Sequence, residues 1–305
     1  MNKKALIGIV IAVLIVGATL AAVIMSKPNQ ENTVYGPNTA LGVVTIDGVI
    51  GGSTSLLGIP QNQNDPVKQI RQAMDDKTIK AVVVKINSPG GSAAKSEEIY
   101  NELLKLKKTG KKIIVSMGDY AASGGYMAAC AGDIIVASPA TLTGSIGVIM
   151  EYTNYEGLYK KLGLKEVIIK SGEYKDIGSP TRDLTPEEKE ILQGVINDTF
   201  DQFIHIVSDG RKMSLDKVKT LANGRVFTGR QALKLGLVDK LGDFYDSVDI
   251  AAKEVGIKGK PQLKYYTTQS PFSTLFGGGE NSNFDGSFIE ILRLLFIDRN
   301  SLNFN

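Results

Sequence analysis

One serine of this sequence stands where a nucleophile could be reached by a peptide. Ser123 follows Ala122 and precedes Gly124 and Gly125, at the start of a predicted helix. Small neighbours let a substrate backbone approach the hydroxyl, and a helix amino terminus adds free N–H groups and positive dipole. Serine is equally common as a plain helix N-cap. The motif alone therefore leaves nucleophile and cap open.

A second loop carries paired glycines. Asn87-Ser-Pro-Gly-Gly91 follows a predicted strand that ends at Ile86. In open α/β sheets, sites form beyond the carboxyl ends of strands. Glycines without a Cβ let backbone N–H groups face outward, which is what an oxyanion hole requires. The residues Ser-Pro-Gly-Gly are also common in ordinary turns, so a turn without a function is the alternative.

A serine nucleophile needs a base, and histidine is nearly excluded. The chain has one histidine, His205, within a helical pattern, where a lone histidine is usually a surface or satisfied core residue. A Ser-His-Asp triad would depend on it entirely. Lysine can serve if burial lowers its pKa from about 10.4 towards neutrality. Lys170 and Lys175 are candidates, and the residues alone do not choose between them.

Composition limits the class of protein. The 305 residues are 43% apolar and 22% charged, with a net charge of +3. That balance, without a basic patch interleaved with aromatics, argues against nucleic acid as a partner. The single cysteine, Cys130, excludes an intrachain disulfide and lies in a run of small residues, where it is expected to pack as a small hydrophobe.

The amino terminus predicts a membrane anchor. Lys3 and Lys4 precede an uncharged run from Ala5 to Met25, which is long enough to cross a hydrocarbon core of about 30 Å. A cleavable signal peptide usually has an apolar region of only about 7–15 residues. We therefore expect residues 1–25 to be an uncleaved transmembrane helix. The lysines place the amino terminus in the cytoplasm and the rest of the chain outside the cell membrane.

The remainder divides into a linker, a domain and a tail. Residues 26–39 are polar and form the linker, and residues 40–265 form the domain. Expected strands at 41–47, 79–86, 112–117, 133–138, 145–150 and 165–170 alternate with helices as far as residue 170. Alternation indicates an α/β class with largely parallel strands, followed by a helical part from a capped start at Thr185.

The tail, residues 266–305, combines a Gly-rich linker with a short apolar helix at Phe288–Ile297. Ten residues cannot span a bilayer. We expect this helix to dock on the domain, on a partner subunit or on the membrane surface.

Six motifs in order resemble the bacterial signal peptide peptidase SppA (protease IV) family, in its short single-unit form. They cover roughly residues 40–255 and are Asn87-Ser-Pro-Gly-Gly91, Ala121-Ala-Ser-Gly-Gly-Tyr126, Thr141-Leu-Thr-Gly-Ser-Ile-Gly-Val148, Lys170-Ser-Gly-x-x-Lys-Asp176, Arg225-Val-Phe-Thr-Gly-Arg-Gln-Ala232 and Leu235-Gly-Leu-Val-Asp239. Residues 266–305 match nothing in the family pattern.

The resemblance implies a crotonase/ClpP-like fold and a Ser-Lys dyad. The family serine falls on Ser123 and the family lysine on Lys175. The oxyanion donors fall on the N–H groups of Gly90 and Gly124, and Ser145 matches a serine that orients the lysine. No metal or cofactor is required.

The resemblance also implies a biological role. The expected enzyme is a serine endopeptidase that degrades signal peptides left after their release from secreted preproteins. It further implies a ring-shaped homo-oligomer that admits extended peptide chains.

Two alternatives come from other classes. A crotonase-like acyl-CoA enzyme would share the glycine-lined oxyanion hole, but it rarely carries an anchor and does not need Ser123 and Lys175 together. A non-catalytic membrane scaffold would tolerate the loss of either residue.

Overall fold

The computed structural model describes residues 40–52 and 65–266. The predicted anchor, the linker and nearly all of the tail lie outside the described residues, so those expectations stay predictions. Within the two described ranges, no helix is long and apolar enough to cross a membrane.

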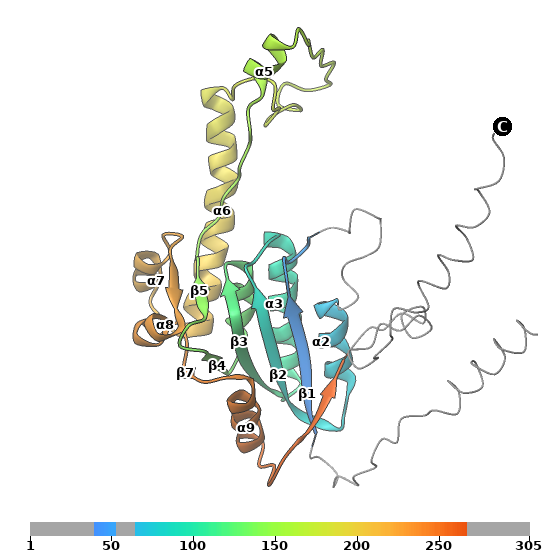
Figure 1. The fold of residues 1–305 in the computed structure, drawn as a ribbon, viewed down its shortest axis with the longest axis vertical. Helices are drawn as coiled ribbons and strands as arrows, with labels where there is room; N and C mark the ends of the chain where they lie inside the picture. Colours follow the sequence, from blue (N-terminus) through green and yellow to red (C-terminus); the bar gives the residue numbers. More distant parts are fainter. Residues whose placement is uncertain (1–39, 53–64, 267–305) are drawn as a thin grey trace, which may run out of the picture. The chain divides into compact units, whose positions relative to one another are not determined.

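A single mixed sheet forms the centre of the domain (Figure 1). Its strands are β1 (Ala40–Asp47), β2 (Ile79–Ser88), β3 (Lys112–Ala122), β4 (Ile134–Ala137), β5 (Leu142–Gly144), β6 (Val226–Thr228), β7 (Lys240–Leu241) and β8 (Gln262–Tyr265). The main path runs β6-β5-β3-β2-β1-β8, with β4 between β3 and β7. Only the β5–β6 pair is antiparallel among the described pairings. The expectation of a largely parallel α/β sheet is confirmed.

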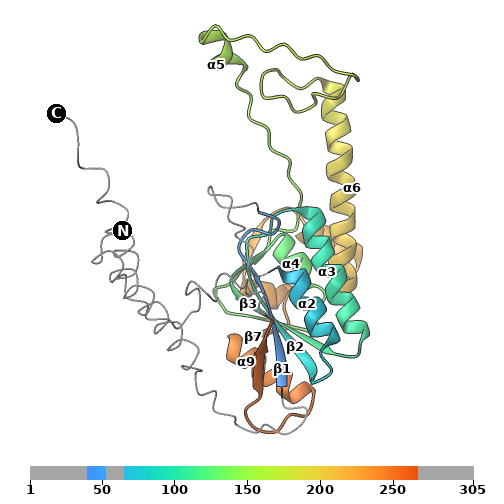
Figure 2. The same cartoon turned by 90° about the vertical axis from the view of Figure 1, so that its right-hand side faces the viewer.

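The helices lie on both faces of this sheet (Figure 2). They are α2 (Pro66–Asp75), α3 (Ala93–Lys108), α4 (Gly124–Ala129), α5 (Glu156–Lys161), α6 (Pro186–Arg211), α7 (Leu215–Leu221), α8 (Gly229–Leu235) and α9 (Phe244–Glu254). The larger core cluster joins α2, α3 and α4 to one face, and α9 closes a smaller cluster on the other.

Strand β2 shows why the sheet must be covered twice. Val82 and Val84 belong to the larger core cluster, whereas Ala81 and Val83 belong to the smaller one. Successive side chains of a strand point to opposite faces, so a nearly continuous apolar run needs helices on both sides.

Helix α6 is the longest described element and begins where the sequence predicts. Thr185 and Glu188 form a capping box, and Pro186 occupies the first turn. At about 1.5 Å per residue a helix of this length is about 40 Å long. Its amino-terminal part extends well beyond the sheet in both views (Figures 1 and 2).

Two predicted strands are wrong. The strand expected at 145–150 is irregular chain after the short β5, and the one expected at 165–170 has no strand partner. Val167 is 75% exposed and Ile169 96% exposed. β-Branched residues predict a strand only if a neighbouring strand is available to pair with it, and here residues 148–183 leave the sheet. We call these residues the arm.

The buried hydroxyl of Tyr126 supplies a test of the fold. It donates a hydrogen bond to the Leu237 carbonyl oxygen at 2.9 Å, and the ring is fully buried. Tyr126→Phe should lower the free energy of unfolding by about 1–2 kcal/mol, because a buried acceptor loses its partner. Urea unfolding of the chain without residues 1–25 measures this. Tyr245→Phe, on an exposed tyrosine, is the control, and equal losses in both variants would contradict the assignment.

Candidate active site

Ser123 connects strand β3 to helix α4 in a strained conformation. Its φ is 52° and its ψ −120°, although it is not glycine. Such backbone angles cost of order 1–3 kcal/mol and cluster at functional sites. Ser123 occupies the N-cap position, yet its side chain makes no capping hydrogen bond. The hydroxyl is thus not engaged in the structural role that the sequence left open.

Backbone hydrogen bonds hold this turn in place. The Ser123 N–H donates to the Gly144 carbonyl oxygen at 2.8 Å, and the Ser123 carbonyl accepts from the Met127 N–H at 2.9 Å. One bond ties the serine to the neighbouring strand and the other to its own helix. The strained angles are therefore fixed from both sides.

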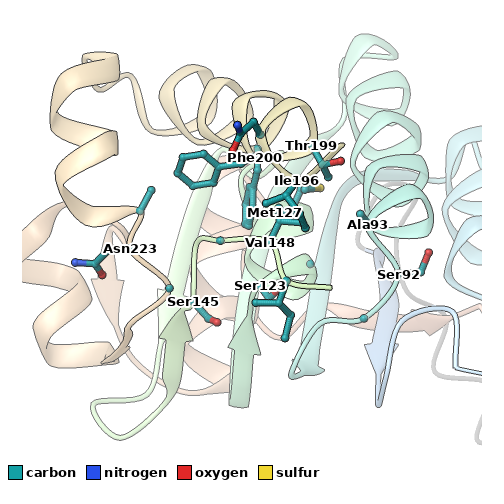
Figure 3. Close-up of a pocket in the computed structure, with 18 of the residues that line it drawn as sticks. Ser92, Ala93, Ser123, Met127, Ser145, Val148, Ile196, Thr199, Phe200 and Asn223 are labelled. Carbon is teal, nitrogen blue, oxygen red and sulfur yellow. The ribbon is translucent and has the colours of Figure 1, made fainter. Parts of the chain in front are cut away.

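Ser145 lies beside Ser123 for a topological reason. Strands β3 and β5 are parallel, with Ala122 opposite Gly144, so the residue after each strand lies at the same edge. Ser145 also has positive φ, 50°, and its N–H donates to the Arg225 carbonyl at 2.9 Å. Figure 3 shows both serines at these strand ends. The structure thus brings together two of the predicted site residues.

The two predicted oxyanion glycines are packed against each other. A Cβ on Gly90 would lie 2.7 Å from the Ser123 Cβ and 2.8 Å from the Gly124 nitrogen. Gly90 also has φ of +104°, which L side chains rarely adopt. Only glycine allows the Gly90 loop to approach the serine this closely.

The Gly90 loop has fixed hydrogen bonds. The Gly90 carbonyl accepts from the Ile50 N–H at 2.8 Å, and the Gly90 N–H donates to the buried Ser88 hydroxyl at 3.1 Å. An oxyanion bound here would share or replace Ser88 as the acceptor. The donor therefore lies next to the nucleophile but is already satisfied.

A cavity of about 910 Å³ opens over Ser123 and Ser145. Helix α6 forms much of its apolar wall through Ile196, Phe200 and Phe203, and Met127 and Val148 line it too (Figure 3). Sequence reasoning missed this wall. The helical spacing of the three α6 residues could have identified an apolar face, but not what that face covers.

The candidate bases lie elsewhere in the chain. Lys175 is an exposed residue of the arm and does not line the cavity. Lys170, also on the arm, pairs with Asp176 at 2.6 Å. His205 is half-exposed beside Asp201 of its own helix and is likewise not among the cavity residues. The structure does not bring any of the three to Ser123 within one chain.

Two other sequence expectations concern Cys130 and metals. Cys130 is buried, and burial raises the pKa of its thiol to about 12, so it packs as an inert residue as expected. Within the described ranges, no group of three or more His, Cys, Asp or Glu residues is placed to hold a metal ion.

Comparison with known proteins identifies the family. The profile of Peptidase family S49 matches residues 105–258. A relative from Enterococcus faecium that is named for signal peptide peptidase SppA is 35% identical over 82% of this chain and 73% of its own length. The chain belongs to peptidase family S49.

Other relatives of this S49 peptidase are also named for proteases. One from Synechocystis sp. is 42% identical over 69% of this chain and 76% of its own length. Protease 4 from Salmonella typhi is 39% identical over 72% of this chain, which spans 33% of that longer protein. Among solved structures, a ClpP1 mutant from Listeria monocytogenes aligns over 67% of this chain and 93% of its own, with a TM-score of 0.43 and 16% identity.

The family establishes the type of activity. This S49 peptidase is an SppA-like serine peptidase, a hydrolase that acts on peptide bonds. The acyl-CoA enzyme and the non-catalytic scaffold are therefore not favoured.

The close packing around Gly124 generates a test. A Cβ on Gly124 would overlap the Ser96 hydroxyl and lie 2.9 Å from the Ser96 Cβ. Gly124→Ala should displace the turn and reduce peptidase activity by about 100-fold, since a displacement of about 1 Å can cost that much. Adding Ser96→Gly removes both clashing atoms and should restore part of the loss.

The matched control is Gly157→Ala, because a Cβ there meets no atom within 4 Å. Initial rates on a fluorogenic peptide, with Ser96→Gly alone alongside, measure the effect. Equal activity of the Gly124→Ala and Gly157→Ala enzymes would contradict the packing argument.

Proposed function

We propose that this S49 peptidase is a membrane-anchored endopeptidase with a Ser123–Lys175 dyad that degrades signal peptides after their release from preproteins. The observation that carries the nucleophile is the strained, uncapped Ser123 at the floor of an apolar cavity, next to Gly90 and Gly124. The parallel sheet and its helices are compatible with a crotonase/ClpP-like fold.

The cavity supports apolar peptides as substrates. The α6 side chains and Met127 offer an apolar surface, whereas Asn197, Asn223 and the glycines offer polar atoms near the peptide path. Signal peptides have cores rich in apolar residues. The name of the E. faecium relative points to the same substrate class.

The position of Lys175 supports a dyad that forms between two copies of the chain. The arm that carries Lys175 also exposes Ile149, Val167 and Ile169 almost fully. Several large apolar side chains exposed on one segment favour a surface that another protein covers. In the proposed homo-oligomer, a ring by family resemblance, the arm of one subunit covers the cavity of the next and brings Lys175 to that subunit's Ser123.

The proposed reaction is acyl transfer to water. The neutral Lys175 amine takes the proton of the Ser123 hydroxyl as its oxygen attacks the peptide carbonyl carbon. The N–H groups of Gly90 and Gly124 stabilise the oxyanion. When the C–N bond breaks, the Lys175 ammonium returns the proton to the leaving amine nitrogen.

Water then releases the acyl group. Lys175 takes a proton from the water as it attacks the Ser123 ester, and returns that proton to the Ser123 oxygen when the ester bond breaks. Ser145 is proposed to orient the amine by accepting a hydrogen bond from it. The anchor, predicted at residues 1–25, would hold this chemistry at the extracytoplasmic membrane surface.

Single substitutions test the dyad. In the full-length enzyme in detergent, Ser123→Ala and Lys175→Ala should each reduce cleavage of a leucine- or alanine-rich fluorogenic peptide by at least about 1000-fold, as loss of a triad member does in other serine hydrolases. Lys161→Ala, on another exposed lysine of the arm, is the matched control. Full activity of the Lys175→Ala enzyme would refute the dyad, and Lys170→Ala and His205→Ala would then be compared.

Mixing tests whether the dyad forms between subunits. Inactive Ser123→Ala and Lys175→Ala chains, dissociated and reassembled together, should regain activity at the interfaces that combine an intact serine with an intact lysine. Each variant reassembled alone should stay inactive. Wild-type chains passed through the same procedure show that assembly is recovered. If they recover and the mixture does not, both residues come from one chain.

A further inference from the structure

An ion network surrounds the residue that follows Lys175. Both carboxylate oxygens of Asp176 are occupied, one by the Lys170 amine at 2.6 Å and the other by the Arg182 Nε at 3.0 Å. Lys170 also donates to the Glu173 carbonyl oxygen at 2.7 Å. The carboxylate adjacent to Lys175 is therefore directed to other cations.

Arg182 connects this network to helix α6. Its two terminal nitrogens donate to the two carboxylate oxygens of Glu188, at 2.8 and 2.5 Å. Glu188 is only 3% exposed and is the capping-box residue of α6. Planar two-point pairing of this kind fixes geometry as well as charge. The loop that carries Lys175 is thus attached to the first turn of the helix whose middle part lines the Ser123 cavity.

The network contains few other titratable groups. Those that interact with Asp176 or with the adjacent Tyr174 are Lys170, Glu173, Arg182, Glu187 and Glu188. Tyr174 donates to Glu187, which raises the pKa of the tyrosine to about 12 and keeps it neutral. Arg182, and then Lys170, hold the pKa of Asp176 well below its usual value. Asp176 is therefore an anion at neutral pH.

That anion would oppose a lysine base. A carboxylate within about 4–6 Å of an amine favours the protonated, inactive form. A free Asp176 could rotate towards the amine of its neighbour Lys175. The Arg182 Nε and the Lys170 amine oppose this rotation, because together they occupy both carboxylate oxygens of Asp176.

We propose that Arg182 is a positioning residue, which holds Asp176 away from Lys175 so that the lysine can act as a neutral base. The proposal rests on the proposed Ser123–Lys175 dyad. It adds a device that keeps a lysine available as a base although an aspartate is the next residue in the sequence. Arg182 acts through Asp176 and need not touch substrate.

The pH profile tests this role. In full-length Arg182→Met enzyme, Asp176 loses one of its two cationic partners and keeps only Lys170, so the rising limb of kcat/KM against pH should move about 1 pH unit higher, with about a 10-fold lower rate at neutral pH. Adding Asp176→Asn removes the carboxylate charge and should move the limb back to the wild-type position. Arg71→Met, which breaks a comparable two-point pair with the buried Glu102 between α2 and α3, should leave the profile unchanged.

If Arg182 only stabilised the fold, its substitution would have a different effect on the pH profile. Arg182→Met would then lower the rate at every pH without moving the rising limb, and adding Asp176→Asn would not restore the rate. An unmoved limb in the Arg182→Met enzyme, or a limb that stays shifted in the double variant, overturns the proposal. If Arg182→Met does not fold by circular dichroism, Arg182→Lys replaces it. This variant keeps the charge but not the fork, so it should show a smaller shift, and the wild-type limb would overturn the proposal.

The test of Arg182 can be distinguished from the test of the Ser123–Lys175 dyad. Lys175→Ala is measured in the same assay. Full activity there refutes the dyad, whereas an inactive Lys175→Ala enzyme beside an unshifted Arg182→Met enzyme refutes only the role of Arg182.

Discussion

The close approach of the Gly90 loop to the Ser123 turn is the constraint on which the site depends. Ser123 takes a positive φ, and side chains at Gly90 and Gly124 would collide with Ser123 and Ser96. Strain of this kind persists only where the surroundings over-determine it. Here the parallel β3–β5 pair and the α4 backbone do so, because each supplies one hydrogen bond to Ser123. The sheet and α4 thus fix the backbone of Ser123, while its hydroxyl makes no capping hydrogen bond.

Helix α6 links the two halves of the proposed chemistry. Its carboxyl-terminal half packs into the core through Phe203, Ile204 and Val207, and Phe203 also lines the cavity above Ser123. Its amino-terminal end holds the Arg182–Glu188 pair of the arm. A helix is stiff over this length, so the position of the arm is set by the same residues that shape the cavity.

The sequence predicted this protein well where local and global preferences agree. Thr185, Pro186 and Glu188 determine the start of α6 by capping chemistry alone, and the apolar run of β2 already implies a strand covered on both faces. Ser123, Gly90, Gly124 and Ser145 were predicted from motif resemblance, and the structure places them at one edge of the sheet. The predicted strand at 165–170 failed because Val167 and Ile169 have β-sheet preferences but no partner strand in the same chain. The cavity wall was missed because a helical stripe does not reveal what it packs against.

Val167 and Ile169 connect the wrongly predicted strand at 165–170 with the proposed mechanism. Apolar side chains as exposed as Ile169 are unfavourable in water, and in the proposed homo-oligomer a neighbouring copy of the chain would cover them. Burial would also remove water from Lys175, and desolvation favours the neutral amine that a base requires. In an isolated subunit the lysine would stay exposed to water, away from its own serine. Assembly would supply both the contact and the desolvation, so a newly made chain would gain peptidase activity only after it has joined its neighbours.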